Sequence, residues 1–397
     1  MTDVHPKDDP SRFVSERAHN IPPSGIRRFF DLLAGMEGVI SLGVGEPDFV
    51  TPEPIRAAAV ASLGRGETHY TSNWGLLELR EAVAENLERL YGVRYDPRSE
   101  ILITVGVSQG LDLAVRATTN PGDQVLCPEP SYVAYLPAVA LAGGEFIAIP
   151  TRAPDGFKPR PAEVERRVTG KACSLLLGYP NNPTGATLTR AEMEALADIA
   201  RRHDLLVISD EIYARLTYAG EHACAAALPG MRERTVLLGG FSKAFAMTGW
   251  RVGYACAPAP IAEAMMKVHQ YTMMCAPTVA QVAALEALRV GEPFVQEMLR
   301  EYDRRRRLIV AGLNELGLDC FEPQGAFYAF PSVKISGMDD EAFAEALLKE
   351  ERVAVVPGSA FGASGRGHVR CCYATELPKI EEALERIARF LAHHSGR

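Results

Sequence analysis

The 397-residue sequence lacks several features that would point to particular classes of protein. It has no uninterrupted apolar run of about eighteen residues, so no membrane-spanning helix is expected. Its N-terminal segment has no apolar core of the kind that a signal peptide carries, which predicts a cytoplasmic location. No internal repeat and no low-complexity segment interrupts it. These absences favour an ordinary globular fold.

Positive charge is also scarce, with 42 Lys and Arg against 50 Asp and Glu and a formal net charge of −8. An acidic chain is not drawn to phosphate backbones or anionic lipid, so neither nucleic acid nor a membrane is expected as a partner. The one basic cluster, Arg304 to Arg307, follows Glu301 and Asp303. We interpret it as the solvated, salt-bridged face of a long helix.

The eight cysteines are scattered, with no pair at the spacing of metal ligands. This distribution is typical of reduced, mostly buried thiols and not of a disulfide framework or a zinc site. The sequence therefore predicts no metal site, and no cysteine is the first choice for a nucleophile.

Apolar residues make up 47% of the chain and form short β-rich runs that alternate with helical segments. Strands and helices in alternation predict an α/β fold with a mostly parallel, seven-stranded sheet. In such sheets ligands bind at the carboxyl ends of the strands. The predicted strands span residues 101–104, 124–128, 145–150, 174–180, 205–209, 235–239 and 251–257.

The pattern changes beyond residue 290, where a long charged helix, a few strands and a closing amphipathic helix indicate a smaller α+β domain. The first residues, with Pro22 and Pro23 before a short helix, are interpreted as an arm. We therefore expect an arm over residues 1–45 that contributes to the small domain, a large domain over 46–290 and a small domain over 291–397.

Lys243 lies in Gly239-Gly-Phe-Ser-Lys-Ala-Phe-Ala-Met-Thr-Gly-Trp-Arg251, directly after an apolar strand. A loop of small residues is an unusual place for a solvated cation, and desolvation favours a neutral amine able to form a Schiff base. Arg251 begins the next apolar run, where a guanidinium can bind an anion bidentately. A purely structural lysine is the alternative.

Other polar residues also follow predicted strands. Asp210 ends the strand over 205–209 and Tyr213 comes a turn later, so the carboxylate either faces a ligand or caps the next segment. Asn182, in Gly178-Tyr-Pro-Asn-Asn-Pro-Thr-Gly185, offers amide donors to an oxygen anion. The turn Thr104-Val-Gly-Val-Ser-Gln-Gly110 leads into a helix whose first N–H groups favour an anion.

These ordered motifs resemble those of the fold type I enzymes that use pyridoxal 5'-phosphate (PLP), and specifically the class I aminotransferases related to aspartate and aromatic aminotransferases. The similarity runs from Ser41-Leu-Gly-Val-Gly-Glu-Pro-Asp-Phe49 to His368-Val-Arg-Cys-Cys-Tyr-Ala374. It implies a fold type I architecture with PLP bound by the large domain.

The resemblance also implies roles for individual residues. Lys243 would hold PLP covalently, Asp210 would pair with the pyridine nitrogen, and Tyr213 would donate to the ring oxygen O3′. The other implied cofactor contacts are a second donor to O3′, a stacking aromatic and a phosphate cradle, namely Asn182, Tyr132, Val107, Ser108, Ser242 and Arg251.

On the substrate side, Arg370 corresponds to the arginine that binds the α-carboxylate, Gly43 lies in the segment that closes over it, and Asn182 is a further expected substrate contact. Tyr70 resembles a tyrosine that reaches the neighbouring subunit's phosphate, which predicts a homodimer. Without the other motifs, the sequence would favour a surface ion pair for Arg370 and an ordinary core aromatic for Tyr70.

The implied reaction moves an amino group between an L-amino acid and a 2-oxo acid by a ping-pong mechanism, with Lys243 as base and then acid. A PLP-dependent lyase on the same fold would carry the same residues, and a half reaction that depends on a keto acid separates the two. A non-catalytic PLP-binding regulator would need a DNA-binding module, for which the N-terminal segment is expected to leave no room.

The expected substrate range follows from one departure from the family pattern. Several aspartate-specialised relatives place a lysine in the phosphate-loop turn where Ser108 stands here, and a hydroxyl pairs with a distal carboxylate less strongly than an ammonium does. We therefore expect apolar or aromatic amino acids, with glutamate and 2-oxoglutarate as the exchange pair and a pocket shaped partly by the arm around Ile21 and Ile26. An aspartate-type enzyme is the alternative.

Overall fold

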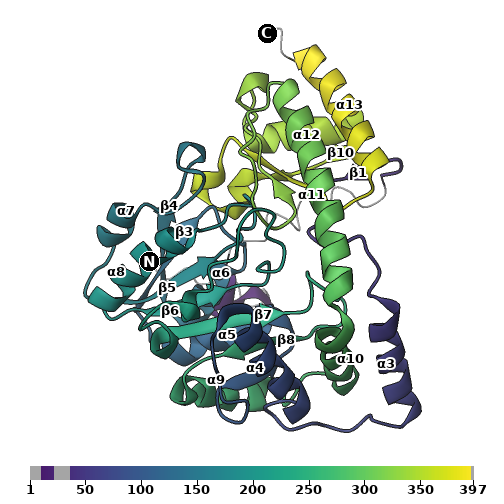
Figure 1. Cartoon of the computed structure of the whole chain (residues 1–397). Helices are drawn as coiled ribbons and strands as arrows, with labels where there is room; N and C mark the ends of the chain where they lie inside the picture. Colours follow the sequence, from purple (N-terminus) through teal and green to yellow (C-terminus); the bar gives the residue numbers. More distant parts are fainter. Residues whose placement is uncertain (1–9, 22–35, 395–397) are drawn as a thin grey trace.

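The computed structural model describes residues 10–21 and 36–394, and its central feature is a seven-stranded sheet (Figure 1). The strand order is β2-β8-β7-β6-β5-β3-β4; β8 is antiparallel to both its neighbours, and all the other pairs are parallel. The predicted mostly parallel sheet is therefore confirmed, and each of the seven predicted runs overlaps one strand. The strands are β2 (Ile101–Thr104), β3 (Gln124–Glu129), β4 (Glu145–Pro150), β5 (Ala172–Gly178), β6 (Leu206–Asp210), β7 (Thr235–Gly240) and β8 (Gly253–Cys256).

Helices cover both faces of this sheet. Successive side chains of a strand point to opposite faces, so neighbouring residues of one strand pack against different helices. Leu176 of β5 packs in the cluster that contains α5, whereas Leu175 and Leu177 pack in the cluster that contains α8. Burial on both faces explains why these strands are continuous apolar runs. The helices of the large sheet and its surroundings are α3 (Glu53–Gly64), α4 (Leu77–Tyr91), α5 (Gly106–Thr118), α6 (Tyr135–Ala142), α7 (Pro161–Glu165), α8 (Arg190–Arg202), α9 (Ala259–Thr272) and α10 (Thr278–Val290).

A second body, at the top of Figure 1, is built on two small sheets and three long helices. One sheet has the order β11-β12-β9, and in the other β1 pairs in parallel with β10, so the end of the predicted arm adds a strand to this body. These elements are β1 (Ile40–Ser41), β9 (Tyr328–Ala329), β10 (Val353–Ala354), β11 (Val356–Pro357), β12 (Val369–Cys372), α11 (Glu292–Glu315), α12 (Asp340–Glu351) and α13 (Leu377–His394), and α1 (Glu16–His19) lies near the N-terminus.

The basic cluster on α11 differs in part from its predicted solvated face. Its ion pairs are present, but Arg305 and Arg306 are buried, at 5% and 8% exposure. Arg305 donates two hydrogen bonds from Nη1 to the carboxylate of Asp48, at 2.8 and 2.9 Å, and so ties α11 to the segment after β1. A local sequence window cannot show this, because Asp48 lies far away along the chain. In the part of the chain that the structure describes, no helix combines the length and apolarity needed to cross a membrane.

Candidate active site

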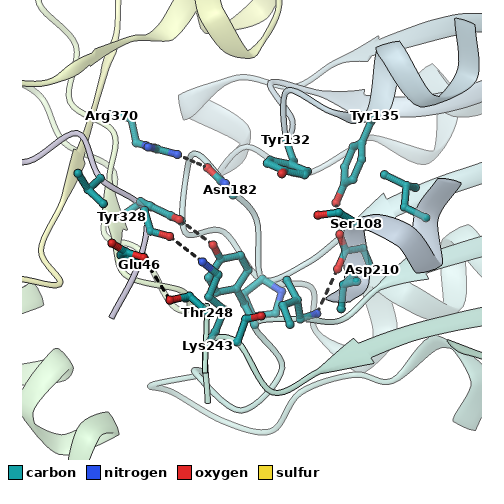
Figure 2. A pocket seen from close by; sticks show the side chains of 18 of the residues that line it. Glu46, Ser108, Tyr132, Tyr135, Asn182, Asp210, Lys243, Thr248, Tyr328 and Arg370 are labelled. Atoms are coloured by element: carbon teal, nitrogen blue, oxygen red, sulfur yellow. Dashed lines mark hydrogen bonds between the residues drawn. The ribbon is translucent and has the colours of Figure 1, made fainter. Parts of the chain in front are cut away.

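A cavity of about 420 Å³ lies where the carboxyl ends of the sheet strands face the smaller body (Figure 2). The sequence-predicted residues come from segments far apart in the chain, yet all but one of them line this cavity. Those present in the lining are Gly43, Val107, Ser108, Tyr132, Asn182, Asp210, Tyr213, Ser242, Lys243, Arg251 and Arg370.

Lys243 enters the cavity from the turn that follows β7. Its Nζ donates a hydrogen bond of 2.6 Å to the carbonyl of Gly45, and it lies 5.8 and 5.6 Å from the ring centroids of Tyr213 and Phe327. None of the described carboxylates forms an ion pair with it. Burial lowers the pKa of Lys243 to about 8, so a nucleophilic, neutral amine is accessible near neutral pH.

Asp210 is the last residue of β6, with its carboxylate buried at the edge of the cavity. Burial raises its pKa to about 6, against hydrogen bonds donated by the Tyr135 hydroxyl at 2.9 Å and by the N–H of Ile212 at 3.2 Å. The carboxylate stays ionised at neutral pH and has no described cation in an ion pair with it. Such a group suits a cationic partner that the protein itself does not supply.

Among the described residues, Asp210 is an anion without a paired cation, whereas the start of α5 has an excess of hydrogen-bond donors without a paired anion. This helix begins at Gly106 without a side-chain cap, and Val107 and Ser108 of its first turn line the cavity. A Cβ built on Gly106 would lie 2.7 Å from Nη2 of Arg251, and the φ of Gly106 is +73°. Only glycine therefore allows the guanidinium to approach the helix N-terminus so closely. The result is an anion cradle of N–H groups, a hydroxyl and a guanidinium.

Arg370, on β12, lines the cavity on the side of the smaller body. Although it is only 2% exposed, it forms no ion pair with a described carboxylate. Its Nη1 donates to Oδ1 of Asn182 at 2.9 Å, and its Nη2 donates to the carbonyl of Gly43 at 2.7 Å. Its Nε is buried without a described hydrogen-bond partner. A buried guanidinium with neutral partners is suited to bind a substrate carboxylate.

Nine residues of the lining were not singled out from the sequence, and four of them form side-chain hydrogen bonds within the site. Tyr135 holds Asp210, and Tyr328 places its hydroxyl 2.6 Å from that of Tyr213. The Thr248 hydroxyl donates to Glu46 at 3.1 Å on another part of the wall (Figure 2). Tyr135 follows Tyr132 at a helical spacing, which was the only local signal for any of them.

The cavity of a single chain does not test the predictions made for Tyr70 and for the arm around Ile21 and Ile26. Tyr70 does not line it, and its side chain is 80% exposed, so a role across a subunit interface stays a prediction. Ile21 is also outside the lining, and Ile26 falls outside the described residues.

The lining fits PLP on four chemical counts. It offers a partly buried lysine without an ion pair to any described carboxylate for the aldehyde, a buried carboxylate for the pyridine nitrogen, an anion cradle for the phosphate and the Tyr132 ring beside them. The Asn182 oxygen is used by Arg370, which leaves the amide nitrogen as a donor for the ring oxygen.

Comparison with known proteins agrees with this chemistry. The chain is 54% identical over 379 residues to a putative aminotransferase of Bacillus subtilis strain 168, YugH, covering 96% of this chain and 98% of the relative. It is 46% identical over 381 residues to an aspartate aminotransferase of Pyrococcus abyssi, covering 95% and 98%. The crystal structure of an aromatic aminotransferase from Pyrococcus horikoshii superposes with a TM-score of 0.88 at 47% identity, covering 92% and 99%.

The sequence profile of the family "Aminotransferase class I and II" matches residues 37–387. Members of class I generally use PLP and follow a ping-pong mechanism. The chain belongs to this family and is an aminotransferase.

Proposed function

We propose that this aminotransferase acts on apolar or aromatic L-amino acids and exchanges their amino group with glutamate and 2-oxoglutarate, using PLP held by Lys243. The observation that carries the substrate class is the count of cations in the cavity. Lys243, Arg251 and Arg370 are the three cations in the described lining, and the cofactor and the α-carboxylate would occupy all of them. No described lining cation is left for a side-chain carboxylate.

Each residue of the cofactor side would have a separate task. Lys243 would hold the cofactor, Asp210 would keep its pyridine nitrogen protonated, and Tyr213 with Asn182 would donate to its ring oxygen. The phosphate would lie against the first turn of α5 and the side chains of Ser108, Ser242 and Arg251, and Tyr132 would stack on the ring. When bound, PLP supplies an electron sink for the electrons released at the substrate Cα.

The proton transfers would belong to Lys243. With its pKa lowered to about 8, the amine can take the Cα proton of the substrate and return it at a neighbouring carbon. Arg370 would bind the α-carboxylate of both amino acid and oxo acid, which fixes the Cα–H bond relative to the lysine. The rings of Tyr213 and Phe327 beside Lys243, and the ring of Tyr328 beside Arg370, would limit the access of water to this step.

Glutamate exchange needs its side-chain carboxylate to be tolerated without a dedicated cation. Neutral hydroxyl and amide donors of the lining can solvate it, with less discrimination than a charged partner gives. Glu46, which also lines the cavity, adds a negative charge that works against a second carboxylate in its vicinity. We therefore expect aromatic and aliphatic amino acids to exceed aspartate in kcat/KM.

The direct test is a panel of phenylalanine, tyrosine, leucine, glutamate and aspartate. For each, conversion of bound PLP to its pyridoxamine form is followed by absorbance, and kcat/KM is measured with 2-oxoglutarate. Aspartate faster by orders of magnitude than every apolar or aromatic amino acid would overturn the proposal.

A designed gain of function sharpens that test. Ser108→Lys would add a cation to the cavity, and its charge-assisted pairing should raise kcat/KM for aspartate about 10-fold or more. Ser108→Met, of similar length but without charge, is the matched control and should give no such gain. An equal response of both variants would mean that bulk, and not charge, governs selection at residue 108.

The proposal includes a homodimer. Tyr70 and Tyr271 are 80% and 86% exposed, and Met274 beside them is 45% exposed. The amide of Asn73 donates to the carbonyl of Met274, so these segments form one continuous surface of a kind that subunit contacts cover. Sedimentation velocity of the holoenzyme should give a dimer; a fully active monomer would contradict this part.

A cytoplasmic location is the remaining part of the proposal. All eight cysteines are free, although Cys371 and Cys372 are neighbours. Free thiols in this number favour a reducing compartment.

A further inference from the structure

Tyr328 lines the cavity and contacts several of its residues, although no role has been assigned to it so far. It is the first residue of β9, is 1% exposed, and pairs in the small sheet with Cys372 of β12. Figure 2 shows it between Arg370 and the part of the wall that carries Lys243. One side chain thus contacts the residues that would bind substrate and those that would bind cofactor.

The ring of Tyr328 supports the guanidinium of Arg370. The Cζ of Arg370 lies 4.5 Å from the Tyr328 ring centroid and 4.9 Å from that of Phe361. Cation–π contact with planar rings holds the guanidinium plane without using up its N–H groups. This explains how a buried arginine with only two neutral acceptors, Asn182 and Gly43, keeps a fixed orientation.

The hydroxyl of Tyr328 makes a different contact, 2.6 Å from the hydroxyl of Tyr213. Burial raises the pKa of both groups, so both keep their protons. The two hydroxyls carry one proton each, and the hydrogen bond between them uses only one of these protons. The other proton is free to be donated to a third group. When Tyr328 is the donor, the Tyr213 proton points away from it, and Tyr213 itself lines the cavity. A hydroxyl that accepts one hydrogen bond also donates the next more strongly.

We propose that Tyr328 is a positioning residue with two separable effects: its ring orients Arg370 toward the substrate carboxylate, and its hydroxyl fixes the Tyr213 proton toward the cofactor oxygen. This inference rests on the proposed function. It predicts that the two effects divide between different measurements, because carboxylate binding depends on the ring and the cofactor's electronics depend on the hydroxyl.

The experiment compares Tyr328→Phe, which keeps the ring, with Tyr328→Leu, which removes ring and hydroxyl. Tyr373→Phe is the matched control, since Tyr373 is equally buried in the same cluster, hydrogen-bonds to another tyrosine and does not line the cavity. Tyr328→Met replaces Tyr328→Leu should the latter not fold. The readouts on the holoenzyme are the pH midpoint of the cofactor absorption band, the Kd of the unreactive carboxylate 3-phenylpropionate, and kcat and KM for phenylalanine.

In Tyr328→Phe we expect the spectral midpoint to rise by about 0.5 to 1 pH unit, because a weaker donor stabilises the oxygen anion less. The Kd of 3-phenylpropionate should stay within about twofold of the wild-type value, and the loss of activity should appear in kcat and not in KM. In Tyr328→Leu the same Kd and KM should rise about 10-fold in addition. Tyr373→Phe should match the wild type in all of these readouts.

An unchanged midpoint in Tyr328→Phe, or a Kd in Tyr328→Leu no weaker than in Tyr328→Phe, would overturn the inference. Failure of the proposed function looks different. There the wild-type protein itself would bind no PLP at Lys243, or would not convert it with any amino acid of the panel.

Discussion

The two sides of the cavity are built by different means. On the proposed cofactor side, Ser108, Asp210 and Lys243 each follow or end a strand of one continuous sheet. On the proposed substrate side, Tyr328 and Arg370 come from a separate three-stranded sheet that meets the large one across the cavity. The proposed cofactor residues therefore belong to one sheet and the segments that follow its strands, whereas the geometry of the proposed substrate side depends on how the two bodies pack. Changes on the first should alter cofactor chemistry, and changes on the second should alter substrate binding.

The largest effect should come from Lys243→Ala. Loss of the amine removes both the covalent hold on PLP and the group that moves the Cα proton, so kcat should fall by about 10⁴-fold or more. After borohydride reduction, peptide mass spectrometry should find a stable PLP adduct on Lys243 of the wild type. The corresponding peptide of the variant should carry no adduct. Lys267→Ala, at an exposed lysine on α9, is the control and should leave both results unchanged. A reduced adduct of normal yield in Lys243→Ala would place the cofactor on another lysine.

Asp210→Asn should have the next largest effect. A neutral amide cannot hold the pyridine nitrogen in its protonated form, and loss of a buried charged partner corresponds to a fall in kcat of about 10²- to 10³-fold. KM for the amino acid should change little, since the substrate side is untouched. Asp204→Asn, at a 93% exposed side chain just before the same strand, is the control. Normal turnover by a folded Asp210→Asn protein would reduce Asp210 to a local cap.

Arg370→Gln tests the other side. Losing the charge-assisted grip on the α-carboxylate should lower kcat/KM about 100-fold for every amino acid, while the Kd of PLP and the cofactor spectrum stay as in the wild type. Arg366→Gln, an exposed arginine that precedes β12, is the control. Cofactor affinity that falls along with kcat/KM would mean that the two sides are not separable.

The same contrast explains what could be predicted from the sequence. Asp210 and Lys243 stand directly at or after apolar runs, and a parallel sheet brings all such positions to one edge, so local pattern was enough to find them. Tyr135 and Tyr328 were missed, because an aromatic residue in an apolar segment has the pattern of a core residue. Their partners, Asp210 and Tyr213, lie 75 and 115 residues away. Only the folded chain shows which buried hydroxyl faces a functional group.

Arg305 was misjudged for a related reason. A run of arginines after acidic residues is typical of an exposed helix face, yet Asp48 neutralises this one inside the protein. The limits of the arm and of the two domains, near residues 45 and 290, stay predictions. Within the predicted arm, β1 pairs with β10 of the smaller body, so this part of the chain joins that body although it precedes the large sheet in sequence.

A smaller effect is expected from Gly106→Ala on the cofactor side. The added methyl group would meet Arg251 at 2.7 Å in a backbone conformation that alanine adopts poorly, so the anion cradle should open slightly. We expect the Kd of PLP to rise about 10-fold, with KM for phenylalanine unchanged at saturating PLP. Gly92→Ala, at the end of α4 and with φ of +70°, controls for backbone strain alone because no atom lies near its added Cβ. An equal rise in both variants would mean that strain, and not the Arg251 contact, is responsible.

The smallest effect, a change of a few fold, should appear in the pH dependence of PLP uptake by the apoprotein. Burial lowers the pKa of Lys243 to about 8, so the neutral fraction of the amine and the uptake rate should rise about fivefold between pH 7 and 8 and level off above pH 9. Burial raises the pKa of Asp210 to about 6, and below that pH the neutral acid no longer pairs with a protonated pyridine. The equilibrium affinity for PLP should therefore fall at acid pH, where Asp210 is protonated. The uptake rate should reach its plateau at alkaline pH, where Lys243 is neutral. Stopped-flow absorbance between pH 5.5 and 10 separates the two, and a rate that keeps climbing to pH 10 would show that Lys243 has the ordinary pKa of a solvated lysine.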